Sequence, residues 1–167
     1  MDHLWTPWRS TYMKEKGDKT RCIFCEAAKS DNDEEWLVVY RGGHSFVILN
    51  RYPYTSGHLM IAPFRHVSRL QQVDEVVTDE IMRLARFAES VLEDIYKPGG
   101  LNLGMNLGEA AGAGIEEHIH LHLLPRWKGD ANFMTAVGNT RIIPETLEDT
   151  YAKVKRGFAA GVIRSPI

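Results

Sequence analysis

The sequence predicts an α+β fold in which two helices pack on an antiparallel five-stranded sheet. Two observations lead to it. Segments with strand character follow one another along the chain, and helical spacing of apolar residues is confined to a central and a C-terminal segment. The composition agrees with an ordinary soluble domain, since 44% of the residues are hydrophobic, 25% are charged and the net charge is −2. At 167 residues the chain fits one domain with a single core.

Five segments have the short, β-rich or alternating character of strands: residues 36–40, 45–50, 59–64, 101–108 and 118–125. The first two are joined by RGGH, residues 41–44, whose glycines favour a hairpin turn and an antiparallel pair. Pro63 should end the third segment or move it to an edge, because proline lacks the N–H that a sheet ladder needs. The glycine-rich residues 109–114 turn the chain before the fifth segment.

The central segment has the apolar periodicity of one long amphipathic helix. Its N-cap is predicted at Thr78, with Asp79 and Glu80 in the first turn, and Pro98-Gly99-Gly100 should stop it. Residues 144–159 can form a second helix. The charged residues 29–35 are interpreted as a loop.

We divide the chain into an N-terminal arm (1–20), one folded domain (21–140) and a C-terminal helical tail (141–167) packed on that domain. The N-terminus lacks the apolar core of a signal peptide, and no stretch approaches the roughly 18 apolar residues of a membrane span. The slightly negative net charge gives no sign of nucleic-acid binding. We therefore expect a cytoplasmic protein with neither a membrane nor a nucleic acid as partner.

Three histidines alternate with aliphatic residues in the predicted fifth strand. Successive strand side chains point to opposite faces, so His118, His120 and His122 should share one face while the aliphatic residues seal the core. Neutral imidazoles on one face can chelate a metal ion, or one of them can act as a nucleophile oriented by a neighbour. The glycine-rich segment just upstream offers backbone N–H groups to an anion, which favours phosphate chemistry.

At this point the sequence resembles a known family. HIHLHLL, residues 118–124, matches the signature of the histidine triad (HIT) nucleotide hydrolases and transferases. Residues 46–67 also resemble the family's strand, turn and Gly-His segment, and residues 122–133 resemble its fragile-histidine-triad and bacterial dinucleoside-polyphosphate branch. The resemblance implies the HIT-like fold and cleavage of the α-phosphate linkage of dinucleoside polyphosphates, diadenosine tetraphosphate above all.

The resemblance also assigns roles to residues. His120 would attack the α-phosphorus and form a covalent nucleotidyl-histidine, His122 would contact the phosphate or bridging oxygen, and His58 would orient His120 by hydrogen bonding. The nucleotide would be bound by further residues: Phe46 and Ile48 at the base, Asn50 at the ribose, and Asn106, Gly112, Ala113, Gly114 and Ile115 at the phosphates. Catalysis would require no metal on the protein, and Mg²⁺ would at most accompany the substrate.

The cysteines form a C-x-x-C motif, which alone is ambiguous between thiol redox chemistry and half of a zinc site. The upstream sequence lacks the buried strand of a redox motif, and a zinc site needs two further ligands. In a branch of the HIT family a similar motif binds structural zinc. The resemblance implies one zinc per chain, held by Cys22, Cys25, His66 and His118.

The chain departs from the fragile-histidine-triad hydrolases just before the triad. Where they carry a glutamine that reaches the phosphate and the attacking water, this chain has Gly114 and Ile115. Losing the side-chain amide leaves room for inorganic phosphate as acceptor, so both hydrolysis and phosphorolysis stay open. The family usually pairs through such a helix and the adjoining strand, which implies a homodimer. Two alternatives are a nucleoside phosphoramidate or acyl-adenylate hydrolase, and a non-catalytic zinc-containing nucleotide-binding module.

Overall fold

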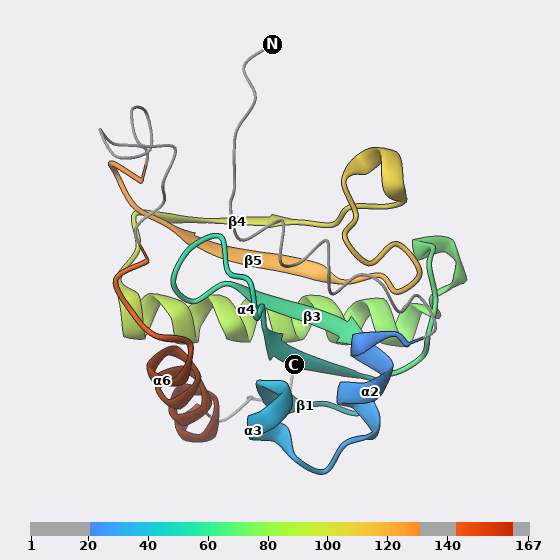
Figure 1. Cartoon of the computed structure of the whole chain (residues 1–167), viewed down its shortest axis with the longest axis horizontal. Coiled ribbons are helices and arrows are strands. Elements are labelled where there is room, and N and C mark those ends of the chain that lie inside the picture. Colours follow the sequence, from blue (N-terminus) through green and yellow to red (C-terminus); the bar gives the residue numbers. More distant parts are fainter. Residues whose placement is uncertain (1–20, 131–142, 162–167) are drawn as a thin grey trace.

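A computed structural model describes residues 21–130 and 143–161 of the chain (Figure 1). Within these ranges five strands form one antiparallel sheet of order β1-β2-β3-β5-β4. They are β1 (Val38–Arg41), β2 (Ser45–Leu49), β3 (Leu59–Pro63), β4 (Gly100–Gly104) and β5 (Leu121–Arg126). This confirms the predicted α+β fold around an antiparallel five-stranded sheet. The predicted N-terminal arm lies outside the described residues.

The hairpin between β1 and β2 confirms the turn predicted at RGGH. The N–H of Gly42 donates to the carbonyl of Ser45 at 2.8 Å. The carboxylate of Glu80 accepts from the N–H groups of Gly43 and His44 at 2.8 and 2.7 Å. A Cβ on Gly42 would lie 2.9 Å from both the Glu80 Oε1 and the Ser45 carbonyl, so the turn requires glycine there.

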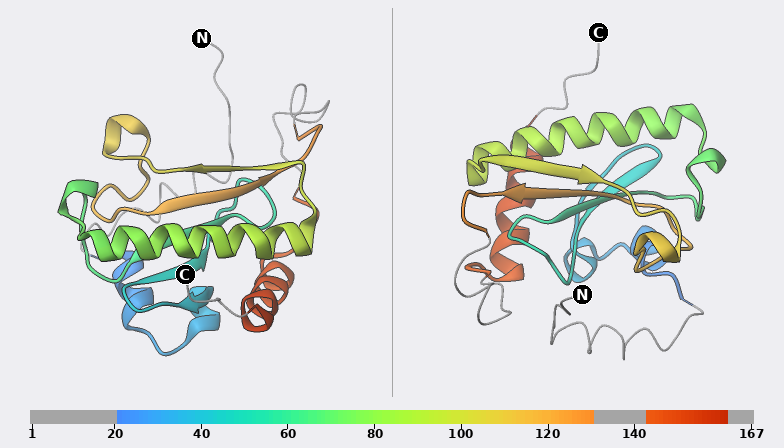
Figure 2. Two further views of the ribbon diagram at one scale, coloured as in Figure 1. Left: turned by 180° about the vertical axis from the view of Figure 1, so that it is seen from behind. Right: turned by 90° about the horizontal axis from the view of Figure 1, so that it is seen from above.

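The long helix α4 (Glu75–Tyr96) covers one face of the sheet, as the two views of Figure 2 show. It begins before the predicted N-cap, because Thr78 lies inside its first turn and donates its hydroxyl to the carbonyl of Glu75 at 2.8 Å. Lys97 adopts a left-handed conformation (φ 44°) and ends the helix directly before Pro98, as predicted. Six residues of the predicted apolar stripe are buried and Ile95 is partly buried; the six are Ile81, Leu84, Ala85, Ala88, Val91 and Leu92.

The expected loop at residues 29–35 is shorter than predicted, because only residues 30–32 separate two short helices. They are α2 (Ile23–Lys29) and α3 (Asp33–Trp36). The side chain of Asn32 accepts from the N–H of Glu35 at 3.3 Å, and three acidic residues in the first turn of α3 favour its N-terminus. In Figure 2, α2 lies on the face of the sheet opposite α4.

Two predicted strands are shorter than expected. β4 ends at Gly104 rather than at residue 108, and β5 begins at Leu121, so that His118 and His120 precede it. The N–H of Ile119 donates to Val67, which lies beyond the end of β3, at 2.8 Å. Leu121 and Leu123 are buried in the core, and Ile119 is also buried.

The C-terminal helix α6 (Leu147–Ala160) begins at Thr146, whose side chain accepts from the N–H of Asp149. It packs against α4 and β1 through the buried Val154 and Phe158. Among the helices of the described ranges, none is long and apolar enough to cross a membrane.

Candidate nucleotide-transfer site and metal-ligand set

His120 lies at the entrance to β5, nine-tenths or more buried. Its Nδ1 lies 2.9 Å from the carbonyl oxygen of His118. A carbonyl can only accept, so Nδ1 carries the proton and the lone pair of a neutral ring is at Nε2. The sequence therefore builds an imidazole whose outer nitrogen is ready to attack an electrophile.

His58 and His122 form a second, linked pair. The N–H of Tyr54 donates to His58 Nδ1 at 3.2 Å, and the amide nitrogen of Asn50 lies 3.3 Å from the same atom. His58 Nε2 therefore carries the proton and donates it to His122 Nδ1, 2.9 Å away. A neutral His122 in turn carries its proton on Nε2, which suits a ring that donates to a phosphate oxygen.

This arrangement corrects one prediction. We expected His58 to orient His120, but its hydrogen bond goes to His122. The backbone carbonyl of His118 orients His120 instead. The rings of His120 and His122 are still close, with centroids 4.7 Å apart, so the three side chains form one cluster.

The cluster is held in its neutral form by its surroundings. Burial lowers the pKa of His58 to about 3, and the neighbouring His122 and His120 contribute in the same direction. Burial likewise lowers the pKa of His122 to about 4. The pKa of His120 is also lowered by burial, although the hydrogen bond to His118 opposes the shift. Neutral imidazole is the nucleophilic form, so the environment favours attack over protonation.

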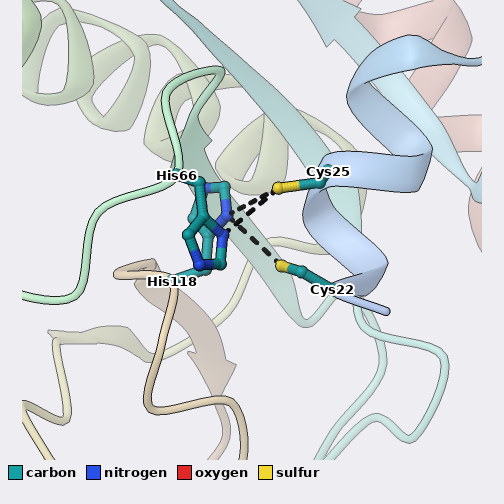
Figure 3. Close-up of side chains that lie close together, drawn as sticks. All are labelled: Cys22, Cys25, His66 and His118. Carbon is teal, nitrogen blue, oxygen red and sulfur yellow. Dashed lines mark hydrogen bonds between the residues drawn. The ribbon is translucent and has the colours of Figure 1, made fainter. Parts of the chain in front are cut away.

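The four predicted zinc ligands converge from distant segments (Figure 3). Cys22 and Cys25 stand at the N-terminal end of α2, His66 follows β3 and His118 precedes β5. Their ligand atoms all lie within 4.8 Å of one another. The pairs are Cys22 Sγ–His118 Nδ1 at 3.4 Å, Cys25 Sγ–His66 Nδ1 at 3.2 Å and Cys25 Sγ–His118 Nδ1 at 3.7 Å.

The donor chemistry of this set fits one zinc ion. Tetrahedral bonds of about 2.0 to 2.3 Å separate ligand atoms by roughly 3.3 to 3.8 Å, and the three pairs above lie close to this range, at 3.2 to 3.7 Å. His118 Nε2 donates to the carbonyl of Pro63 at 2.8 Å, which turns the Nδ1 lone pair toward the cysteines. Burial raises the pKa of the Cys22 thiol to about 11, so a thiolate there requires a cation beside it.

Some backbone N–H groups of the predicted phosphate-binding loop are already bonded to carbonyls within the loop. The N–H groups of Gly112 and Ala113 donate to the carbonyls of Glu109 and Gly108. Within the described ranges, the N–H groups of Gly114 and Ile115 have no protein acceptor. These two backbone N–H groups, rather than all four of the predicted ones, have the capacity left for a phosphate oxygen. Asn106 is half-buried on the chain leading into this loop.

The predicted base-binding residues lie on the expected face but are covered. Strand register places Phe46 and Ile48 on the same side of the sheet as His122. However, Phe46 is 0% and Ile48 4% exposed. Phe64 stacks on Phe46 with ring centroids 5.3 Å apart. Both residues belong to the hydrophobic core, and no surface of Phe46 is free for a base.

Two aromatic rings beside the histidines were missed in the sequence. Phe24, between the two cysteines, lies with its ring centroid 4.8 Å from that of His120. The ring centroid of Tyr54 lies 4.8 Å from that of His58 and 6.3 Å from that of His122. Tyr54 also borders a polar and aromatic cavity of about 650 Å³ beyond the histidines, lined further by Ser56, Tyr96, Trp127, Lys128 and Lys153. Trp127 packs edge-on against Tyr96.

The sequence was compared with protein families and with known proteins. A family model described as HIT domain matches residues 32–129. A protein of Mycobacterium tuberculosis named AP-4-A phosphorylase is 41% identical over 158 residues, which cover 90% of this chain and 80% of that protein.

Solved structures show the same fold. A zinc-bound histidine triad family protein from Mycobacterium smegmatis aligns with a TM-score of 0.68 at 24% identity, covering 83% of this chain and 94% of that one. A hypothetical histidine triad nucleotide-binding protein from Sulfolobus tokodaii aligns with a TM-score of 0.66 at 25% identity, covering 83% and 93%.

Proposed function

The chain belongs to the HIT domain family, and from this premise we propose that it is an enzyme that cleaves dinucleoside polyphosphates, with diadenosine tetraphosphate as substrate. The observation that carries the proposal is His120. It is a buried, neutral imidazole whose Nδ1 is bonded to a carbonyl and whose Nε2 is left as the nucleophilic atom. The similarity to a protein named AP-4-A phosphorylase supports the substrate class.

The reaction would proceed in two displacements. His120 Nε2 forms a bond to the α-phosphorus of one adenosine, the bond to the bridging oxygen breaks, and that oxygen leaves with ATP carrying the electron pair. The His120 Nδ1 proton stays on its hydrogen bond to the His118 carbonyl, which holds the ring in line throughout. The adenylyl group is then transferred from His120 to an acceptor. Splitting the exchange in this way replaces one difficult attack by two easier ones.

The second histidine pair supplies a proton donor to the phosphate. His58 holds His122 in the tautomer that carries a proton on Nε2. Donation from that nitrogen, together with the N–H groups of Gly114 and Ile115, would neutralise charge on the phosphate oxygens as it develops. Asn50, bonded to His58, is proposed to reach the ribose, and Asn106 a phosphate oxygen.

We propose inorganic phosphate as the acceptor. Where the fragile-histidine-triad hydrolases carry a glutamine, this chain has Gly114 and Ile115, so no side-chain amide stands there to position water. The name of the Mycobacterium tuberculosis relative supports phosphorolysis in the same direction. Phosphate attack on adenylyl-His120 yields ADP, whereas water yields AMP.

Product analysis tests this proposal. The purified protein is incubated with diadenosine tetraphosphate in phosphate and in phosphate-free buffer, beside a His120→Ala variant, and nucleotides are separated by chromatography. ATP plus ADP, formed only with phosphate and only with His120, is the expected result. ATP plus AMP in both buffers would make the protein a hydrolase, and no turnover would leave it a nucleotide-binding module.

Zinc is proposed at Cys22, Cys25, His66 and His118, where it would cross-link α2 to the sheet. It takes no part in the two displacements.

We also propose a cytoplasmic homodimer that pairs through α4 and the edge strand β4, whose Leu103 is 52% exposed. Size-exclusion chromatography with light scattering measures the molar mass of the protein in solution and so its oligomeric state.

A further inference from the structure

We propose that Phe24 is a positioning residue for His120, and that the metal-ligand set holds Phe24 in place. The inference rests on the proposed function, since it assigns His120 the role of nucleophile. Phe24 is completely buried and lies in the first turn of α2, between Cys22 and Cys25 in sequence. A core phenylalanine is the ordinary explanation of such a residue, and its particular contacts argue for more.

The ring of Phe24 contacts both the nucleophile and one of the predicted metal ligands. Its centroid lies 4.8 Å from that of His120 and 5.1 Å from that of His118, at tilts of 38° and 50°. It also meets the ring of Phe46 edge-on, with centroids 6.4 Å apart. Phe46 is itself stacked on Phe64, so Phe24 has an aromatic backing and cannot retreat without opening a void.

Two of the contacts that hold His120 involve the metal-ligand region. One is the ring of Phe24, which blocks rotation of the imidazole away from its line of attack. The other is the carbonyl of His118, which binds Nδ1, while the side chain of the same residue offers its own Nδ1 to the cysteines. A shift of the metal ligands would reach the nucleophile through both routes.

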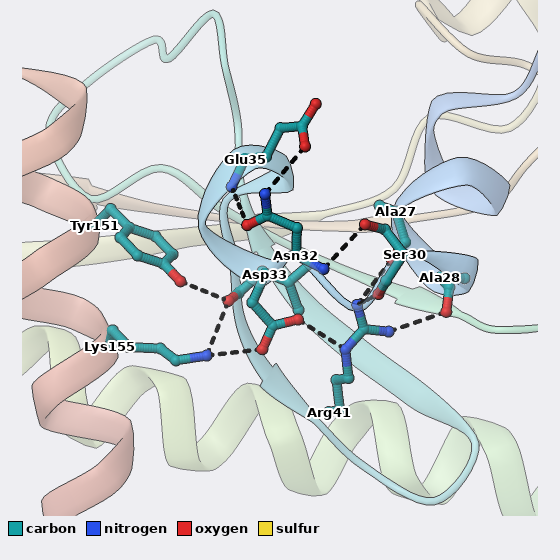
Figure 4. A network of polar contacts seen from close by, with 10 residues as sticks. Ala27, Ala28, Ser30, Asn32, Asp33, Glu35, Arg41, Tyr151 and Lys155 are labelled. Carbon is teal, nitrogen blue, oxygen red and sulfur yellow. Dashed lines mark hydrogen bonds and ion pairs between the residues drawn. The ribbon is translucent and has the colours of Figure 1, made fainter.

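Helix α2 has different groups at its C-terminal end (Figure 4) and at its N-terminal end (Figure 3). At the C-terminal end the guanidinium of Arg41 donates to the carbonyls of Ala27, Ala28 and Ser30 at 2.8 to 3.0 Å. Asp33 fixes that guanidinium through a 2.8 Å ion pair. At the N-terminal end no side chain caps the helix, and the cysteines stand there instead.

A helix of seven residues is not stable by itself, so its free end needs an anchor. The metal-ligand set lies at the end that carries Phe24, whereas Arg41 secures the other end. Loss of the metal would therefore release the first turn of α2 and, with it, the ring against His120. The metal site acts on catalysis through position and not through contact with substrate.

Phe158 is the matched control for a purely structural role. It is also a buried phenylalanine, on α6, and its ring packs against Phe87 at 5.0 Å and Tyr40 at 5.8 Å. Among the described residues its ring contacts are with these two and not with the histidine cluster. A Phe→Leu change at either position removes a similar volume from the core, and only the change at Phe24 should affect His120.

The experiment compares the full-length wild type, Phe24→Leu and Phe158→Leu, all reconstituted with zinc. Zinc content is measured by mass spectrometry of the metal, and Tm by calorimetry. The reactivity of His120 is followed by the rate at which diethyl pyrocarbonate modifies it, located by peptide mass. Steady-state kcat and KM are measured with diadenosine tetraphosphate in phosphate.

We expect Phe24→Leu to retain zinc, to lower kcat about tenfold or more with KM little changed, and to accelerate modification of His120. Phe158→Leu should lower Tm with wild-type kcat and wild-type modification rate. Chelation of zinc from the wild type should accelerate modification of His120 as Phe24→Leu does. Equal modification rates of His120 in the two leucine variants, or no effect of chelation, would overturn the inference.

The modification rate is independent of turnover, so the two proposals can fail separately. Faster modification without any reaction on the dinucleotide would retain the positioning role and reject the proposed substrate. Normal turnover with equal modification rates would retain the function and reject the positioning role.

Discussion

His58 offers the sharpest test of how the cluster works, because it touches no predicted reacting atom. Its Nε2–H donates to His122 Nδ1 at 2.9 Å, and its Nδ1 accepts from the N–H of Tyr54. Replacing it by phenylalanine preserves much of the ring volume and removes both bonds. His122 then loses the donor that fixes its tautomer.

The expected magnitude follows from the burial of the pair. Leaving a buried hydrogen-bonding group unsatisfied costs about 1 to 3 kcal/mol. If the whole cost appears in the transition state, kcat falls by about 5- to 160-fold, since 1.36 kcal/mol is tenfold. KM should change little, because the lost bonds are within the protein. Kinetics with diadenosine tetraphosphate in phosphate buffer measure both constants.

Two companion variants make the test specific. The side chain of His44 is exposed in the hairpin turn, so His44→Phe should leave kcat unchanged. A glutamine at position 58 can donate an amide N–H, so His58→Gln should recover part of the rate. A His58→Phe enzyme with kcat within twofold of the wild type would refute the reasoning that His58 orients His122.

Three further outcomes are expected. Removing zinc from the wild type with a chelator should lower Tm by about 5 °C or more, because the ion binds and stabilises only the folded state. The Cys25→Ser variant should contain less zinc than the one equivalent per chain expected of the wild type. An unchanged zinc content would exclude this ligand set. Burial lowers the pKa of His58 to about 3 and of His122 to about 4. Below about pH 6.5 the unfolded chain therefore binds protons that the folded chain does not, and the free energy of unfolding decreases as the pH falls. Denaturant titrations should show this decrease in the wild type and a smaller decrease in His58→Phe. Gly114→Gln should raise the ratio of AMP to ADP by restoring a side-chain amide, whereas an unchanged ratio would remove Gly114 from the explanation of acceptor choice.

Much of the fold follows from local patterns in the sequence. The hairpin at Gly42 and the apolar stripe of α4 were predicted, because glycine spacing and helical periodicity are local signals. Helix α2 was missed, since it is too short for periodicity and is held by distant groups such as Arg41. The early start of α4 was missed because Thr78 resembles an N-cap but lies inside the first turn.

The sequence predicted which residues form the candidate site better than it predicted the hydrogen bonds between them. The four metal ligands converge as the resemblance implied, because C-x-x-C and the two histidines form a specific pattern. The bond from His58 to His122 spans 64 residues, and no local signal distinguishes it from a bond to His120. Phe24 was not singled out in the sequence, because the role proposed for it depends on a contact with His120 that only the fold creates.

The central claim is that His120 carries the adenylyl group, and peptide mass spectrometry tests it most directly. The protein is mixed with diadenosine tetraphosphate in phosphate-free buffer, quenched and digested, and a second sample receives phosphate before the quench. The account predicts an adenylyl group on His120 that disappears on addition of phosphate as ADP is formed. Release of ATP with no adduct on His120, under conditions that preserve phosphohistidine-type bonds, would contradict it.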